Sequence, residues 1–311
     1  MKHSIKSIAL ALSLSLPLAF GGVANADAPV TSAAAAVQSK SVITHIRTQD
    51  GLKLHLQKDI PQKPKAIVVI SHGLASHSGV FGDFAKTMNA DGIGVYRFDH
   101  RGHGKSDGRD SIHIKSYFEM VEDLRLVVQK AKAEYPNTPI FVLGHSMGGH
   151  ISALYGTKYP DDVNGFILAA GVLRYHQMNF GYLPRPEPKD SFVSGAVSLT
   201  TLNIPFEGAG LSVEGDPLML EKFSVSFPNS FKEGLEYLKD NARQFAAPVM
   251  LISGNKDVFV SPQDAIDFYN ETKSNDKSLM LYPNFGHLLM LEKGGQKIND
   301  DVAEWIGERV K

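Results

Sequence analysis

Six short, continuous apolar runs are spread along the chain, and they constrain its fold more than any other feature. Each is four to six residues long, which is typical of strands that are buried on both faces of a sheet. The runs are residues 66–70, 93–98, 140–143, 165–170, 249–252 and 278–282. Segments with helical spacing of apolar residues separate them. Strand–helix alternation of this kind predicts a mostly parallel central sheet with helices on both faces.

The segments between and before these runs support that architecture. Apolar residues recur at three- and four-residue spacing over 117–131, a proline opens a predicted helix over 262–272, and a last helix contains Trp305. Residues 41–60 alternate apolar and polar side chains around Asp50-Gly51. This alternation predicts an antiparallel hairpin at the start of the domain.

The stretch 172–245 interrupts the alternation. It contains six prolines and scattered aromatic and aliphatic residues. It is too long for an ordinary loop, and its apolar content is too high for a linker. Because so much apolar surface needs something to cover, we expect an inserted lid made of short helices.

The N-terminus has the three parts of a secretory signal peptide. Two lysines precede the apolar stretch 8–20, and Ala24-Asn25-Ala26 supplies a small-x-small cleavage site. The apolar stretch is shorter than the roughly 20 residues of a membrane-spanning helix, which favours cleavage after Ala26 over anchoring. We therefore expect residues 1–26 to be removed from an exported protein, periplasmic or secreted. Residues 27–40 would then form a flexible leader to a domain over 41–311.

Composition excludes several other kinds of protein. The 32 Lys and Arg residues are balanced by 33 Asp and Glu residues, and no basic cluster is present, so we expect no nucleic-acid partner. The chain has no cysteine. Disulfides, a thiolate nucleophile and Cys-ligated metals are therefore excluded.

The segment Gly144-His145-Ser146-Met147-Gly148 matches the pattern G-x-S-x-G. It directly follows the apolar run at 140–143, and a helix is expected from Gly148 to about residue 159. A sharp strand-to-helix turn needs small residues around the serine and places its oxygen above the sheet at a helix N-terminus. The pattern predicts Ser146 as a nucleophile and the Met147 N–H as one oxyanion donor.

The loop that follows the run at 66–70 is His72-Gly73-Leu74-Ala75-Ser76-His77-Ser78-Gly79. A loop in this position can direct a backbone N–H at the developing oxyanion, and Leu74 is our candidate donor. No third ligand stands at supporting spacing from His72 and His77, so we expect no metal here. Both histidines are interpreted as loop-organising residues, and His77 is also the candidate substrate-binding residue.

Asp257 and His287 each come just after a predicted buried strand, where parallel sheets present their ligand-facing loops. The chain order Ser146, Asp257, His287 is nucleophile, acid, base. His287 can take the serine proton and return it to a leaving group, while Asp257 holds the imidazole and stabilises the imidazolium. The three residues form the candidate catalytic triad.

Taken together, these motifs resemble the monoacylglycerol lipase and lysophospholipase branch of the α/β-hydrolase fold, which is related to the S33 serine aminopeptidases. The resemblance runs from about residue 44 to the C-terminus. It is carried by His72-Gly73, by His77-Ser78-Gly79, by Phe98-Asp99-His100-Arg101-Gly102-His103-Gly104-Lys105-Ser106 and by Gly144-His145-Ser146-Met147-Gly148-Gly149. One departure is Val80-Phe81, where these lipases often have Arg-Tyr.

The resemblance implies the Ser146–Asp257–His287 triad, oxyanion donors at Leu74 and Met147, no cofactor, and a lid that admits an acyl chain. It also assigns His100 and His103 to structure near the site entrance rather than to zinc. The partner it implies is a small lipid or ester substrate, and the lid allows a transient contact with a lipid surface.

These observations lead to three hypotheses about function. The first is a secreted serine hydrolase that cleaves carboxylic esters of single-chain lipids, either monoacylglycerol or lysophospholipid, through an acyl-enzyme on Ser146. The second places a serine aminopeptidase or a general short-chain carboxylesterase on the same scaffold. An aminopeptidase would need lid carboxylates to bind an α-amino group, and the stretch offers Glu187, Asp190, Glu207, Glu214, Asp216 and Glu221. The third is a non-catalytic binding protein of hydrolase fold, which the complete triad disfavours.

Overall fold

The computed structural model describes residues 39–109, 113–175, 183–188, 191–194, 216–220 and 222–310. The predicted signal peptide and much of the predicted lid lie outside these ranges. The predicted leader also lies outside them, except for its last two residues. Those two residues belong to the first strand, which begins at Ser39.

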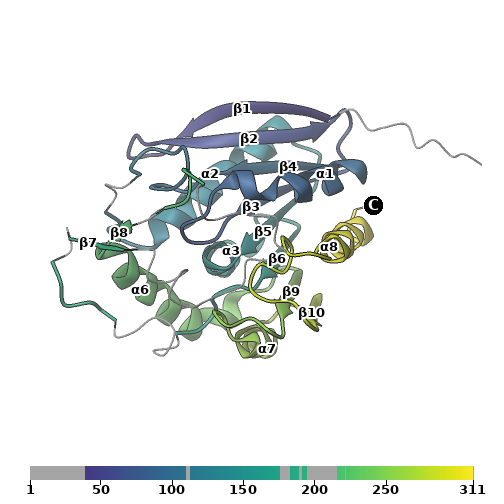
Figure 1. The fold of residues 1–311 in the computed structure, drawn as a ribbon. Helices are drawn as coiled ribbons and strands as arrows, with labels where there is room; N and C mark the ends of the chain where they lie inside the picture. The colour runs from purple at the N-terminus through teal and green to yellow at the C-terminus, as the bar shows by residue number, and fades with distance from the viewer. Residues whose placement is uncertain are drawn as a thin grey trace, which may run out of the picture. The chain divides into compact units, whose positions relative to one another are not determined.

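An eight-stranded sheet forms the centre of the domain (Figure 1), in the order β1-β2-β4-β3-β5-β6-β9-β10. The pairs β1–β2 and β2–β4 are antiparallel, and every other pair is parallel. The six predicted strands and the predicted hairpin are therefore confirmed, and five of the six are buried throughout. The prediction of burial on both faces is wrong for β10, which lies at the edge of the sheet, is mostly half-buried and exposes Leu281. The strands are β1 (Ser39–Arg47), β2 (Lys53–Pro61), β3 (Ala66–Ser71), β4 (Ile93–Phe98), β5 (Ile140–His145), β6 (Gly165–Ala169), β9 (Val249–Gly254) and β10 (Lys277–Tyr282).

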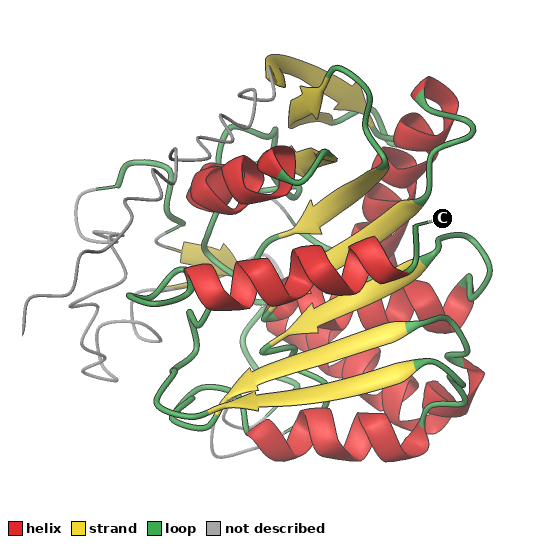
Figure 2. Ribbon diagram, turned by 90° about the vertical axis from the view of Figure 1, so that its right-hand side faces the viewer, coloured by secondary structure: helices red, strands yellow, loops and turns green. Residues whose placement is uncertain are grey.

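Helices cover both faces of the sheet (Figure 2). Alternate side chains of one strand enter two separate cores: Ile67 and Val69 face one, and Val68 and Ile70 face the other. Helices α2 (Phe118–Glu134), α3 (Met147–Lys158) and α7 (Pro262–Glu271) bury residues in the first core, and α1 (Gly82–Ala90) and α8 (Gln296–Glu308) bury residues in the second. Apolar layers on both faces explain why the inner parallel strands β3, β5, β6 and β9 are mostly apolar.

The described part of the predicted lid differs from a set of short helices. It holds one long helix, α6 (Ser226–Asn241), followed by η2 (Ala242–Gln244), and the short antiparallel strands β7 (Phe192–Ser194) and β8 (Lys222–Ser224). Pro228 is compatible with this helix because it lies in the first turn of α6, where a backbone N–H makes no intrahelical hydrogen bond. The apolar face of α6 packs into the first core.

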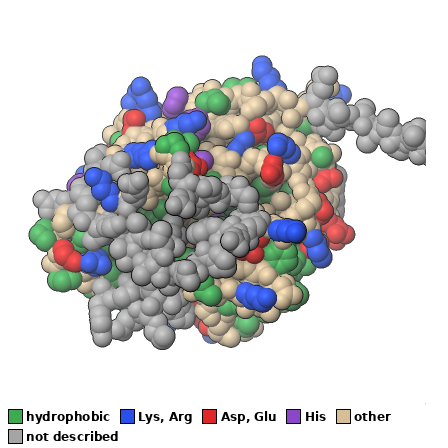
Figure 3. Space-filling model, in the orientation of Figure 1, with side chains coloured by type: hydrophobic (Ala, Val, Ile, Leu, Met, Phe, Trp, Pro, Cys, Tyr) green, Lys and Arg blue, Asp and Glu red, His purple; other side chains and the backbone are tan. Residues whose placement is uncertain are grey.

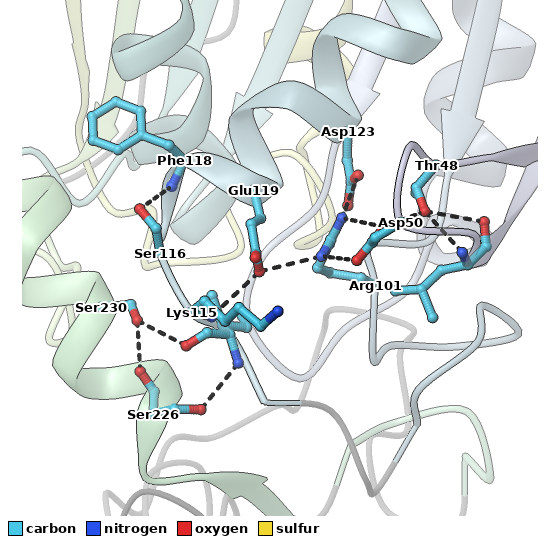
Figure 4. Close-up of polar contacts among 12 residues, drawn as sticks. Thr48, Asp50, Arg101, Lys115, Ser116, Phe118, Glu119, Asp123, Ser226 and Ser230 are labelled. Atoms are coloured by element: carbon cyan, nitrogen blue, oxygen red, sulfur yellow. Dashed lines mark hydrogen bonds and ion pairs between the residues drawn. The ribbon is translucent and has the colours of Figure 1, made fainter.

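Arg101, from the motif Phe98–Ser106, connects three segments of the chain through its side chain (Figure 4). Its guanidinium donates two hydrogen bonds to Asp123 of α2, at 2.6 and 2.8 Å, and also reaches Asp50 and Glu119. Only 5% of its side chain is exposed. The cation therefore joins the β1–β2 turn, the loop after β4 and α2.

The described residues also show how charge is distributed on one face and whether any helix could span a membrane. On the face that Figure 3 shows, the described Lys and Arg side chains are interspersed with Asp and Glu. Across the described residues, no helix has both the length and the apolar character needed to cross a bilayer.

Candidate active site

Ser146 occupies the tight turn between β5 and α3. Its backbone has φ 56° and ψ −117°, in the left-handed half of the map that a side chain rarely adopts. Its N–H donates to the Ala169 carbonyl at 2.9 Å, and its own carbonyl accepts from the N–H groups of His150 and Val172, both at 3.2 Å. Surrounding main chain thus holds the strained residue in place, as expected for a side chain presented for chemistry.

The two flanking glycines are required by close backbone approach. A Cβ on Gly144 would lie 2.2 Å from the Gly148 carbonyl oxygen, and a Cβ on Gly148 would lie 1.9 Å from the Ser71 carbonyl oxygen. No side chain fits at either position. The G-x-S-x-G pattern is therefore a packing requirement: Gly144 packs against α3, and Gly148 packs against the end of β3.

The structure brings the three predicted triad residues into one hydrogen-bonded chain. His287 Nε2 lies 2.9 Å from Ser146 Oγ, and His287 Nδ1 lies 2.8 Å from Asp257 Oδ2. The other oxygen of Asp257 accepts the N–H groups of Phe259 and Val260, at 2.8 and 2.9 Å. A carboxylate that only accepts requires His287 to carry its proton on Nδ1, which leaves Nε2 free to accept the serine proton.

The loops that carry Asp257 and His287 are joined to each other. The Asn255 side-chain oxygen accepts the Asn284 N–H at 2.8 Å, and the Lys256 N–H donates to the Phe285 carbonyl at 2.9 Å. Parallel pairing of β9 with β10 brings the two loops to the same edge of the sheet. Sequence reasoning did not single out Asn255, because its partner is 29 residues away.

The loop after β3 lies against the serine turn. A Cβ on Gly73 would lie 3.2 Å from Ser146 Cβ, so the chain at Leu74 passes beside the nucleophile. Within the described part of the chain, the Leu74 and Met147 amides have no hydrogen-bond acceptor. Two unpaired amides beside the serine are what an oxyanion hole requires.

His72 controls the direction of one of these amides. Its Nδ1–H donates to the Gly73 carbonyl at 2.8 Å, and its Nε2 accepts the His100 N–H at 3.1 Å. The Gly73 carbonyl and the Leu74 N–H belong to one planar peptide unit and point in opposite directions, so the first bond orients the second group. Burial lowers the pKa of His72 to about 3, which keeps the ring neutral, and the two hydrogen bonds fix its tautomer.

His77, the predicted substrate contact, has both ring nitrogens hydrogen-bonded within the protein. Its Nδ1 accepts the Gly79 N–H at 3.0 Å, and its Nε2–H donates to Asp216 Oδ2 at 2.9 Å. The Leu220 N–H also donates to the Ala75 carbonyl, at 2.8 Å. His77 therefore ties the returning end of the insertion to the oxyanion loop. Nothing in the sequence indicated that these two residues, 139 positions apart, would pair.

Two further side chains that sequence reasoning missed, His145 and Glu292, bond to the main chain around His287. His145 is the variable residue of the G-x-S motif, and no spacing links it to position 287. Burial lowers the pKa of His145 to about 4, so it acts as a neutral donor. Among the described residues, no three His, Asp or Glu side chains are arranged to hold a metal ion.

The parallel sheet, the strained serine turn and the hydrogen-bonded triad define the class as α/β-hydrolase, with the arrangement of a serine hydrolase. The family model described as serine aminopeptidase, S33, matches residues 62–294. The chain belongs to this family, and its fold class is confirmed.

Sequence relatives include lipases. The monoacylglycerol lipase of Mycolicibacterium smegmatis is 29% identical over 255 residues, covering 78% of this chain and 88% of the relative. The monoglyceride lipase of Homo sapiens is 26% identical over 286 residues, covering 86% and 91%. The match therefore spans most of the length of both enzymes.

Solved structures agree. The monoacylglycerol lipase of Paleococcus ferrophilus has a TM-score of 0.63 at 25% identity, covering 82% of this chain and 99% of that one. A soluble variant of the monoglyceride lipase of Saccharomyces cerevisiae, bound to a substrate analogue, has a TM-score of 0.76 at 19% identity, covering 88% and 98%; at this identity the likeness shows the fold. The chain is a hydrolase, and these relatives place it with the ester-cleaving members of the class.

Proposed function

We propose that the protein hydrolyses the carboxylic ester of a single-chain lipid, a monoacylglycerol or a lysophospholipid, through an acyl-enzyme on Ser146. The observation that carries this proposal is the Asp257–His287–Ser146 hydrogen-bond chain beside the free amides of Leu74 and Met147. The lipase names of several relatives support the lipid substrate.

The reaction would proceed in two steps, acylation of Ser146 and hydrolysis of the acyl-enzyme. As Ser146 Oγ attacks the ester carbonyl carbon, His287 accepts the serine proton, and the carbonyl electron pair moves to an oxygen that Leu74 and Met147 stabilise. Collapse breaks the ester C–O bond, and the leaving alcohol takes the proton from His287. Water then repeats the sequence on the acyl-enzyme, which releases the fatty acid and restores the serine.

The peptidase alternative needs a carboxylate available for a substrate amine. Of the lid acids that the sequence offered, Glu187 pairs with Arg185 and Asp216 pairs with His77. The other four candidates, Asp190, Glu207, Glu214 and Glu221, lie outside the described residues. The names of the relatives favour the ester substrate.

Product release from defined substrates tests the proposal. Fatty-acid release would be followed from a monoacylglycerol, a lysophospholipid and a short-chain aryl ester, and amine release from an aminoacyl arylamide, with Ser146→Ala as the blank. We expect Ser146-dependent release from one of the two lipids. We also expect Asp257→Asn to lower kcat by roughly 10⁴-fold, because the asparagine no longer holds the His287 proton on Nδ1 and Nε2 is then not free to accept the serine proton. Turnover of the arylamide alone, or activity that survives Ser146→Ala, would refute the proposal.

We also propose that the protein is exported and that residues 1–26 are removed. The N-terminal segment supports transport across a membrane with cleavage after Ala26. Mass spectrometry of the protein recovered from outside the cytoplasm should find Asp27 at its N-terminus. An intact residue 1 in that fraction would contradict this processing.

A further inference from the structure

The peptide groups on both sides of His287 are held by two side chains that take no part in the triad. Glu292 Oε1 accepts the N–H groups of Gly286 and Leu288, at 3.1 and 3.2 Å, and its Oε2 also lies 3.1 Å from the Gly286 nitrogen. His145 Nε2–H donates to the His287 carbonyl at 2.9 Å. The peptide that joins His287 to Leu288 is thus bonded at both its N–H and its C=O.

The hydrogen bonds of Glu292 and His145 hold a segment that belongs to no helix or strand. His287 lies between the end of β10 and the start of α8, in a stretch of turns. The Glu292 N–H donates to the Leu288 carbonyl at 3.0 Å, so a turn of the chain returns the Glu292 carboxylate to the amides on either side of the histidine. A side chain that accepts nearby backbone N–H groups fixes such a turn, as a cap does at a helix end.

We propose that Glu292 is a positioning residue for the base: its carboxylate sets the main chain of His287 so that the ring meets Ser146 and Asp257 at once. This inference rests on the proposed function. The ring must satisfy two distances together, 2.9 Å to the serine and 2.8 Å to the carboxylate. Since both atoms are carried on one rigid imidazole, a rotation or shift of the backbone at His287 lengthens at least one of them.

The size of the effect follows from this geometry. Without Glu292, water replaces the carboxylate, and only His145 and the contacts of the neighbouring loop still orient this peptide. A displacement of about 1 Å at a reacting group costs on the order of 10²-fold in rate, so partial loosening predicts a fall in kcat of about 10-fold to 100-fold. Substrate binding does not use these bonds, so KM should change by less than about twofold.

The experiment compares Glu292→Ala, Glu292→Gln and the matched control Glu304→Ala in the full chain. Glu304 is an exposed acid of α8, so its loss removes the same charge without these bonds. We would measure kcat, KM and the thermal midpoint with the ester that wild type cleaves in a Ser146-dependent manner, and count active sites with a fluorophosphonate. The low-field proton resonance of His287 Nδ1–H, assigned by its loss in Asp257→Asn, gives a readout that needs no substrate.

The glutamine variant separates positioning from folding. Its amide oxygen can still accept both N–H groups, so kcat should recover to within about threefold of wild type. We expect Glu292→Ala to lower kcat per titrated site and to broaden the low-field resonance, while Glu304→Ala changes neither. Wild-type kcat and an unchanged resonance in Glu292→Ala would overturn the inference, as would a glutamine variant no better than alanine. Absence of Ser146-dependent turnover in wild type would instead refute the proposed function.

Discussion

Gly148→Ala is the substitution whose effect the structure predicts most directly. The added Cβ would lie 1.9 Å from the Ser71 carbonyl oxygen, 2.4 Å from its carbon and 2.7 Å from the His72 carbonyl oxygen. All three are main-chain atoms at the end of a central strand and cannot rotate away. The first turn of α3 must therefore retreat from β3 by about 1.5 Å to reach ordinary van der Waals contact.

That retreat separates the two amides of the proposed oxyanion hole, since Met147 moves with the helix and Leu74 stays with the strand. Loss of one such donor costs about 10²-fold to 10³-fold in kcat, and a misplacement of about 1 Å costs about as much. We therefore expect kcat to fall by at least about 10²-fold. Overpacking should also lower the free energy of unfolding by about 1–3 kcal/mol.

The matched control is Gly82→Ala at the start of α1. A Cβ there has no heavy atom within 4 Å, and the backbone is right-handed helical with φ −61° and ψ −45°. This variant should keep full activity and unfold at the same free energy or slightly higher, because alanine restricts the unfolded chain. The assay is ester hydrolysis together with urea unfolding of both variants. A Gly148→Ala enzyme with kcat within about twofold of wild type would refute the packing argument.

The remaining predictions concern stability. Arg101→Ala should lower the free energy of unfolding by about 3–5 kcal/mol in urea, because it leaves Asp123, with 3% of its side chain exposed, without its cation; a loss below about 1 kcal/mol would contradict this. Burial raises the pKa of Glu134, but hydrogen bonds from Tyr96, Lys130 and Lys58 outweigh it and lower this pKa to about 2. Because the folded-state pKa lies below the unfolded value near 4.5, Glu134 stabilises the fold fully above that pH and loses its contribution as the pH falls toward 2. Glu134→Gln should therefore lower the thermal midpoint at pH 7 and less so at pH 3, and parallel pH profiles for the two proteins would refute the assignment.

The sequence alone determined the central sheet and the candidate nucleophile, acid and base. Buried parallel strands must be apolar on both faces, so they stand out as continuous runs, and their carboxyl ends must meet at one edge. Ser146, Asp257 and His287 could therefore be placed together from their positions after strands, before any contact was known. Gly144 and Gly148 were expected for the same local reason, since a tight turn leaves no room for side chains.

Only the tertiary structure decided which side chains support those three residues. No pattern in the sequence indicated that Glu292 and His145 would bond to the main chain around His287, or that Asp216 would pair with His77, and two of these bonds join residues 139 and 142 positions apart. The same holds for His77, whose ring nitrogens bond to Gly79 and Asp216. Hydrogen bonds across such separations depend on how the loops pack once the sheet has formed. The spacing of apolar residues along the chain predicts which side chains are buried. It does not predict which acceptor each buried polar donor will bond to.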